Sequence, residues 1–565
     1  MSPLSMRAQG VTITHRARIV RGAMLAVPLA FVGVFFVYPV VAIVGRGLVP
    51  DGRLDLAPLG EVFTDADLLE VIWFTLWQAA LSTLLTVVVA LPGAYVLARS
   101  DFRGRALIRA AVTVPFVLPT VVVGSAFRSL FGDDGPLGAL GLDQSLAAIL
   151  IAHVFFNYAV IVRTVGGLWS HLDPRQEEAA RVLGASRWQA FRTVTLPALR
   201  PALAAAASIV FLFTFTSFGV ILILGGPHYA TLDVEIYRQT ADLLNLRLAA
   251  ALTIVQLLAV VSLLLVSARA QGHRAEALRL RAAAEVVRRP VGRQRAFLAG
   301  NLLVMAVLLG TPLAVLVERS FAISPDHYGL AFYRALSELR RGTSLFVPPT
   351  EAIRNSLVFA TIATVLAVGI GALAAFALAG GRRGSGSKRG AFAAQSVETA
   401  LMLPLGVSAV TVGFGFLIAL DAPPLDLRGS AALIPIAHAL VALPLVVRIL
   451  LPVLRSIDDR LRETAAVLGA SPARVWREVD LPIIMRAALV AAGFAFAISL
   501  GEFGATIFIV RPDDPTLPVV IFRLLGQPGA LNFGAAMAAS TILMVLTGAA
   551  VLAIERFRVG SVGEF

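Results

Sequence analysis

The chain contains no cysteine, a single lysine, Lys388, and few charged residues of either sign. The absence of cysteine excludes disulfide bonds and thiolate metal sites. Charged residues make up 15% of the 565 residues and hydrophobic residues 58%, whereas soluble globular proteins carry about 25% charged residues. This composition, with many apolar runs of about 20 residues, is typical of a polytopic membrane protein.

Motifs for nucleotide chemistry are also absent from the sequence. No segment matches G-x4-G-K-[ST], and the only lysine lies in residues 384–389 (GSGSKR), whose spacing is wrong for a phosphate-binding loop. We interpret this segment as a flexible loop. No nucleophile, base and acid occur in a recognisable catalytic pattern. The chain is therefore expected to be neither an ATPase nor any other enzyme.

Twelve apolar segments are long enough to cross a membrane. They lie near 22–48, 71–98, 107–131, 146–170, 201–224, 246–268, 296–318, 352–379, 396–420, 430–454, 486–510 and 533–555. Arginines concentrate in alternate loops, and the loops between them are more acidic or mixed, so the net charge of +13 fits the rule that positive loops face the cytoplasm. We predict an all-α membrane protein with about 12 transmembrane helices and both termini in the cytoplasm.

The sequence also contains an internal repeat. His153 matches His438 and Arg238 matches Arg523, both at an offset of 285 residues. Each half has an even number of predicted spans, so the two six-helix repeats should be parallel, related by an axis along the membrane normal. We expect a first repeat at 1–268 with its core at 70–268, a basic cytoplasmic linker at 269–295, and a second repeat at 296–565 with its core at 350–556.

The most informative part of this repeat is a polar segment that occurs twice. Residues 178–197 and 463–482 are identical at 11 of 20 positions. Each copy reads as a short helix, a bend at glycine, and a Leu-Pro pair that opens the next span. The exposed apolar residues expected are Val182, Leu183 and Phe191 in one copy and Val467, Leu468 and Trp476 in the other. Either the bundle itself or a groove on a partner protein must cover them.

The two segments resemble the signature loop of type I ABC importer permeases, E-A-A-x3-G-x9-I-x-L-P. The matching residues are Glu178, Ala179, Ala180, Gly184, Leu196 and Pro197 in the first copy, and Glu463, Thr464, Ala465, Gly469, Leu481 and Pro482 in the second. Valine replaces isoleucine in both copies, and Thr464 replaces alanine. The resemblance covers both halves and implies that 173–200 and 458–485 are ATPase-coupling loops.

This resemblance also implies the partners of the chain. Two copies of a cytoplasmic ABC ATPase would bind ATP and magnesium, and Glu178 and Glu463 would pair with their basic groups. An extracytoplasmic binding protein would deliver the solute, and the chain itself would bind no cofactor and no nucleic acid. The resemblance places the protein in the bacterial plasma (inner) membrane, surrounded by lipid. A secondary transporter with two parallel halves is the main alternative, but it would need no matched coupling loops.

The solute is less well defined by the sequence. Segments such as 74–79 (FTLWQA) and 152–157 (AHVFFN) are similar to fused permeases of thiamine importers, whereas 501–504 (GEFG) is also similar to fused ferric-iron permeases. Thiamine is the favoured solute and ferric iron the alternative.

Four residues are candidates for the lining of the translocation path: Glu502, its repeat partner Ser217, Trp77 and Asn157. A carboxylate inside a predicted span is costly, so Glu502 either attracts a cationic solute or makes a hydrogen-bonded helix contact. His153 and His438 are too few for a metal site, and a buried packing role is expected for them.

Overall fold

The computed structural model describes residues 15–49, 52–272, 286–324, 326–339, 344–383, 388–421, 423 and 425–557. The strands in these residues form one small antiparallel hairpin, β1 (Ala322–Ser324) and β2 (His327–Tyr328), and the other elements are helical. Ten of the described helices are long and apolar enough to cross a membrane, or up to 12 if two bent helix pairs count as one span each. The predicted all-α membrane fold is confirmed.

The first half contains α1 (His15–Val32), η1 (Gly33–Val37), α2 (Tyr38–Leu48), α3 (Ala57–Thr64), α4 (Ala66–Arg99), α5 (Arg105–Val117), α6 (Thr120–Phe131), η3 (Gly138–Leu140), α7 (Leu146–Trp169), α8 (Pro174–Val182), α9 (Arg187–Ala190), η4 (Phe191–Thr195), α10 (Leu196–Phe215), α11 (Gly219–Leu224), α12 (Leu232–Tyr237), η5 (Arg238–Asp242) and α13 (Leu246–Gly272).

The second half contains α15 (Arg293–Met305), η6 (Ala306–Gly310), α16 (Thr311–Phe321), β1, β2, α17 (Ala331–Ala335), α18 (Pro349–Arg383), α19 (Lys388–Met402), η7 (Leu403–Gly406), α20 (Ala409–Ala419), α21 (Leu433–Ser456), α22 (Asp459–Val467), α23 (Pro472–Val475), η8 (Trp476–Asp480), α24 (Leu481–Gly501), α25 (Thr506–Ile509), α26 (Leu517–Leu525) and α27 (Ala530–Phe557).

Two of the predicted spans are broken. The apolar segment predicted at 107–131 is present as two helices, α5 and α6, which meet at an angle of 100°. Leu118 precedes Pro119 and is extended, as the residue before a proline prefers. The predicted span at 396–420 is also bent, by 97°. At this bend Ser408 caps α20 by accepting a hydrogen bond from the N–H of Val410.

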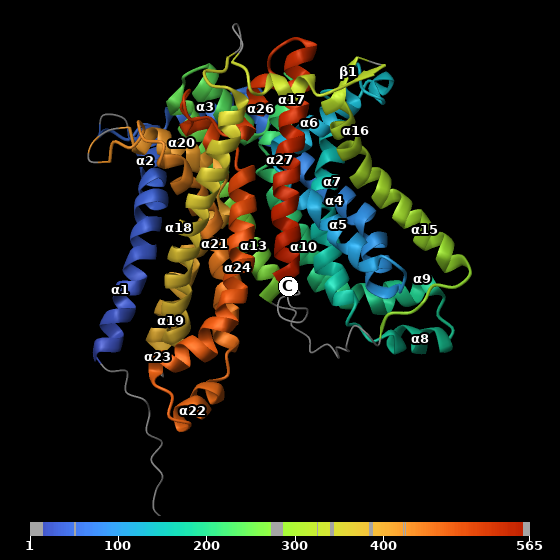
Figure 1. Ribbon diagram of the computed structural model, residues 1–565, viewed down its shortest axis with the longest axis vertical. Coiled ribbons are helices and arrows are strands. Elements are labelled where there is room, and N and C mark those ends of the chain that lie inside the picture. The colour runs from blue at the N-terminus through green and yellow to red at the C-terminus, as the bar shows by residue number, and fades with distance from the viewer. Residues whose placement is uncertain are drawn as a thin grey trace, which may run out of the picture.

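The first span of each half packs against the other half. In Figure 1, α1 and α2 run beside the yellow α18 and the orange α20 of the second half, and α15 and α16 lie beside the blue and cyan helices of the first half. Val32 and Phe36 accordingly belong to the buried cluster of the second half, and Leu316 belongs to that of the first half. This exchange joins the two repeats into one bundle.

The two repeated loops lie at the same end of the bundle, here called the lower end, where Figure 1 shows α8 and α9 on one side and α22 and α23 on the other. Helix α1 begins and α27 ends toward this lower end, whereas α6, α17, α20 and α26 lie at the opposite, upper end. The arrangement is that of parallel repeats. Residues 273–285 of the predicted linker lie outside the described residues.

Candidate functional site: coupling loops and an aromatic closure

The first coupling loop is a capped short helix that ends at a glycine. Asp173 starts α8 by accepting a hydrogen bond from the N–H of Arg175, and Pro174 occupies the first helical turn. Gly184 has a φ of +95°, a left-handed conformation that costs other residues about 1–2 kcal/mol. A capping box formed by Ser186 and Gln189 then opens α9.

The second coupling loop repeats this construction. Asp458 caps α22 by accepting from the N–H of Arg460, and Gly469 has a φ of +83°. The backbone N–H of Ala470 donates to the carbonyl of Ala465, as that of Ala185 does to Ala180 in the first loop. The predicted glycine bend is therefore present in both copies.

The tips of both loops expose apolar side chains. Val182 and Leu183 are 88% and 89% exposed, and their repeat partners Val467 and Leu468 are 87% and 82% exposed. The bundle's own lower face therefore leaves both pairs uncovered. Phe191 departs from the prediction of an exposed side chain: it is half-buried because it stacks between Trp169 and Trp188.

A polar contact ties each short helix to the helix that follows it. In the first loop the hydroxyl of Thr195 donates to Glu177 at 3.3 Å. The equivalent positions in the second loop are Asp480 and Arg462, which form an ion pair with an N–O distance of 2.8 Å. Arg462 also binds Asp459 at 2.7 Å. These carboxylates hold the pKa of Arg462 above its usual range although its partial burial acts in the opposite direction.

Glu178 already has a partner within the chain. Arg288 lies at the described end of the linker and places its guanidinium 2.7 Å from the Glu178 carboxylate. The Arg288 backbone exchanges hydrogen bonds with Arg99 and Asp101 at the end of α4, at 2.9 Å each. The linker is thus attached beside the first coupling loop.

At the upper end, aromatic rings from both halves meet. Phe218 and Phe503 are equivalent positions of the repeat, and their rings stack at a centroid distance of 5.5 Å. Tyr237 packs edge-on against Phe522, its own repeat partner, at 6.5 Å and against Phe508 at 5.8 Å. Because repeat-related residues touch each other here, this aromatic closure lies on the pseudo-twofold axis between the halves.

The residues that precede the stacked rings are held by the two histidines. His153 bridges Ser82 and Ser217, with each ring nitrogen 2.9 Å from a hydroxyl oxygen. His438 bridges Ser499 at 2.7 Å and Thr506 at 2.8 Å, and its Nε2 lies 3.3 Å from Glu502. Both histidines are buried, in the packing role expected from the sequence.

Glu502 occupies a joint between helices. The prediction that it lies inside a span is wrong, because α24 ends at Gly501 and α25 begins only at Thr506. Its carboxylate accepts hydrogen bonds from the N–H groups of Ala505 at 2.8 Å and Thr506 at 3.0 Å. Glu502 therefore caps α25 and pairs with His438 in this conformation.

The four predicted path residues are only partly brought together. Ser217 and Asn157 share His153, since the Asn157 amide donates to the His153 carbonyl at 3.0 Å. Trp77 stands apart and packs edge-on against Phe74. Sequence reasoning missed Phe218 and Phe503, although the matched segments Ser217–Gly219 and Glu502–Gly504 contained the signal.

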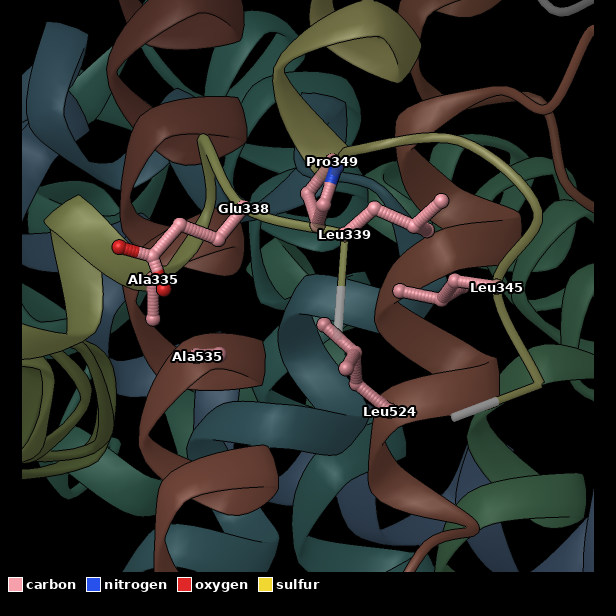
Figure 2. Close-up of a pocket in the computed structure, with 7 residues that line it drawn as sticks. All are labelled: Ala335, Glu338, Leu339, Leu345, Pro349, Leu524 and Ala535. Atoms are coloured by element: carbon pink, nitrogen blue, oxygen red, sulfur yellow. The ribbon is translucent and has the colours of Figure 1, made fainter. Parts of the chain in front are cut away.

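The upper surface also has a hollow, which Figure 2 shows between α17, the start of α18, α26 and α27. It is lined by Ala335, Glu338, Leu339, Leu345, Pro349, Leu524 and Ala535. Glu338 is the one ionisable group in this lining, so the hollow lacks the convergent polar groups expected of a solute site.

The fold and these two sites define a membrane transport subunit built from two repeats. Residues 90–275 match the family model described as the binding-protein-dependent transport system inner membrane component. The sulfate transport system permease protein CysT of Escherichia coli is 33% identical over 208 residues, which cover 36% of this chain and 74% of that protein. The chain belongs to this family of inner-membrane transport components.

Two longer relatives match both halves. The thiamine transport system permease protein ThiP of Escherichia coli is 29% identical over 489 residues, covering 83% of this chain and 87% of ThiP. A probable ABC transporter permease protein, y4fN of Sinorhizobium fredii, is 26% identical over 523 residues, which cover 87% of this chain and 88% of y4fN. The fused, two-repeat organisation is thus shared with these relatives.

Proposed function

We propose that the chain is the membrane subunit of an ATP-driven importer for thiamine, which an extracytoplasmic binding protein delivers to the upper end. One observation carries this proposal: two matched coupling loops stand at the same end, each with an exposed valine and leucine. The resemblance to ThiP along most of the chain supports thiamine as the solute. Ferric iron has no comparable support among these relatives.

The coupling loops are the docking points for two ATPase copies. Val182 and Leu183 on one loop, and Val467 and Leu468 on the other, would enter grooves on the ATPases, helix-in-groove fashion. ATP and magnesium bind to the ATPases, and the chain itself needs no cofactor. Glu178 and Glu463 would pair with basic groups there, so Glu178 must exchange Arg288 for an ATPase residue.

The rigid construction of each loop explains how movement passes into the bundle. The Glu177–Thr195 and Arg462–Asp480 contacts fasten each docked helix to the helix that continues into α10 or α24. Both α10 and α24 end directly before the stacked rings of Phe218 and Phe503. When ATP closes the ATPases, the loops would pull these two helices and separate the aromatic closure toward the outside.

The orientation follows from the same roles. The lower end with the ATPases is cytoplasmic. Helix α1 begins and α27 ends toward this end, which supports the proposal that both termini are cytoplasmic. The upper end, which carries the aromatic closure, faces the binding protein.

Uptake measurements in cells test this proposal. Labelled thiamine and, separately, labelled ferric iron are given to cells that lack the gene or carry it intact or as Gly184→Val/Gly469→Val. Gly141→Val is the matched control, because Gly141 also has a positive φ, +62°, and an open neighbourhood but lies in an upper-end loop.

Thiamine uptake should be lost in the deletion and in the double variant and kept in Gly141→Val. Loss of iron uptake instead would identify ferric iron as the solute and leave the proposed ATP-driven import mechanism standing. Uptake that survives in the double variant would contradict ATPase coupling and favour the secondary-transporter alternative.

A further inference from the structure

Asp233, at the start of α12, is a fully buried carboxyl group that the closure and the coupling loops leave unexplained. Its Oδ1 accepts two hydrogen bonds, from the amide of Gln256 at 2.9 Å and from the hydroxyl of Ser408 at 2.7 Å. Its Oδ2 is also buried and has no hydrogen-bond partner among the described residues. Burying a carboxyl oxygen without a partner is costly, so this site calls for a functional explanation.

The Ser408 contact crosses between the two halves. Asp233 follows Ser217 and Phe218 in the first half, whereas Ser408 sits at the bend before α20 in the second half. The repeat-related positions are Pro518 and Pro119, whose side chains cannot form hydrogen bonds. One side of the pseudo-twofold axis therefore carries a carboxyl–hydroxyl hydrogen bond between the halves, whereas on the other side the hydroxyls of Ser125 on α6 and Ser540 on α27 meet at 3.1 Å.

We propose that Asp233 is a protonation-controlled latch that holds the upper end closed through Ser408 and is released when the halves separate. This inference rests on the proposed transport function and adds to it a positioning residue and a dependence on pH. Separation of α12 from α20 would break the Asp233–Ser408 hydrogen bond and admit water to the carboxyl group. Hydration favours its charged form, whereas burial favours its neutral form.

The surroundings of Asp233 leave burial as the main influence on its proton. The helices packed against α12 are α4, η5, α13 and α20, and α20 carries no ionisable side chain. The ionisable groups on α4, η5, α13 and α12 itself are Asp67, Glu70, Tyr95, Arg99, Arg238, Asp242, Arg247, Arg269, Glu235 and Tyr237. Burial raises the pKa of Asp233 from 3.8 to about 7, and the hydrogen bonds from Ser408 and Gln256 oppose this rise.

The direction of the pH effect follows from the higher pKa of Asp233 in the buried, closed state than in the hydrated, open state. The closed state binds the proton more tightly than a hydrated open state, so the latch stabilises closure at low pH and loses this effect as the pH rises through 7. With a pKa of about 7 when closed and near 3.8 when hydrated, the ratio of closed to open molecules falls about tenfold between pH 6 and pH 8.

The absence of cysteine allows a direct test. Ser217→Cys, a change of one atom at a buried position beside the closure, introduces a single thiol into the chain, which is reconstituted in proteoliposomes with a cysteine-free ATPase and a cysteine-free binding protein. A membrane-impermeant maleimide on the binding-protein side labels this thiol only when the closure opens. Labelling rates are measured during ATP turnover from pH 6 to pH 8, with Asp233 intact and with Asp233→Asn.

Dividing the two rates at each pH removes the pH dependence of the thiol itself. The labelling rate with Asp233 intact, divided by the rate with Asp233→Asn, should rise about tenfold between pH 6 and pH 8. Glu235→Gln is the matched control, because Glu235 lies on the same short helix but bonds Gln239 within its own half. The labelling rate of Glu235→Gln should show the same pH dependence as that of the protein with Asp233 and Glu235 intact.

Two results would overturn the latch, and they bear differently on transport. A ratio that stays constant with pH, while labelling still depends on ATP, would refute the latch and leave the importer intact. A thiol that is never labelled during ATP turnover would refute both the latch and the assignment of the aromatic closure.

Discussion

Truncating the exposed leucine at the tip of each coupling loop should weaken ATPase binding without weakening the fold. Leu183 is 89% exposed and Leu468 is 82% exposed, so Leu→Ala removes three carbon atoms that contact little within the chain. At about 0.8 kcal/mol per buried CH2, docking that covers either leucine loses about 2 kcal/mol, or about 30-fold in affinity.

The assay is the dissociation constant between the purified ATPase and the detergent-solubilised permease, measured without nucleotide for Leu183→Ala and Leu468→Ala separately. Leu258→Ala is the matched control, because Leu258 is 63% exposed but lies within the apolar span of α13. Thermal unfolding checks that each variant keeps its stability. If both loop variants fold normally and bind the ATPase as tightly as the unaltered chain, the docking role of the loop tips is refuted.

The remaining predictions concern the closure, the loop contacts and the linker. Phe503→Ala should let thiamine leak through the permease in proteoliposomes without ATP. Both Phe503→Ala and the buried control Phe127→Ala should lose about 3–5 kcal/mol of unfolding free energy, but the control should not leak. Arg462→Ala should make protease cleavage at 459–480 faster and leave the first loop unchanged, because Arg462 pairs with both Asp480 and Asp459. Arg288→Ala should change the unfolding free energy by less than about 1 kcal/mol, since its pair with Glu178 is exposed, and should strengthen ATPase binding at low salt by freeing that carboxylate. A weaker binding of the ATPase to this variant would contradict the exchange of partners at Glu178.

The features that the sequence predicted correctly are those with a local signal. The glycine bends at Gly184 and Gly469 need only a left-handed residue between two short helices, and the Leu-Pro pairs mark the start of α10 and α24. Hydropathy likewise identified the spans, because each must be apolar along its own length.

Features that depend on distant parts of the chain could not be predicted in this way. Hydropathy does not report backbone direction, so the bend at Leu118-Pro119 and the helix break at Glu502 were read as continuous spans. Hydropathy also does not indicate which helices pack together, so the packing of α1 and α15 against the opposite halves could not be predicted. The stack of Phe218 on Phe503 required the pseudo-twofold axis to be placed in space.

Cysteine cross-linking tests the central claim most directly, because the chain supplies no thiol of its own. Val182→Cys and Val467→Cys are made singly and together, and the complex is treated with a bifunctional thiol reagent against an ATPase that carries one cysteine in its docking groove. Each single variant should capture one ATPase and the double variant two, a difference that denaturing electrophoresis resolves. Capture of one ATPase by the double variant, or of none by any, would contradict a permease driven through two equivalent loops.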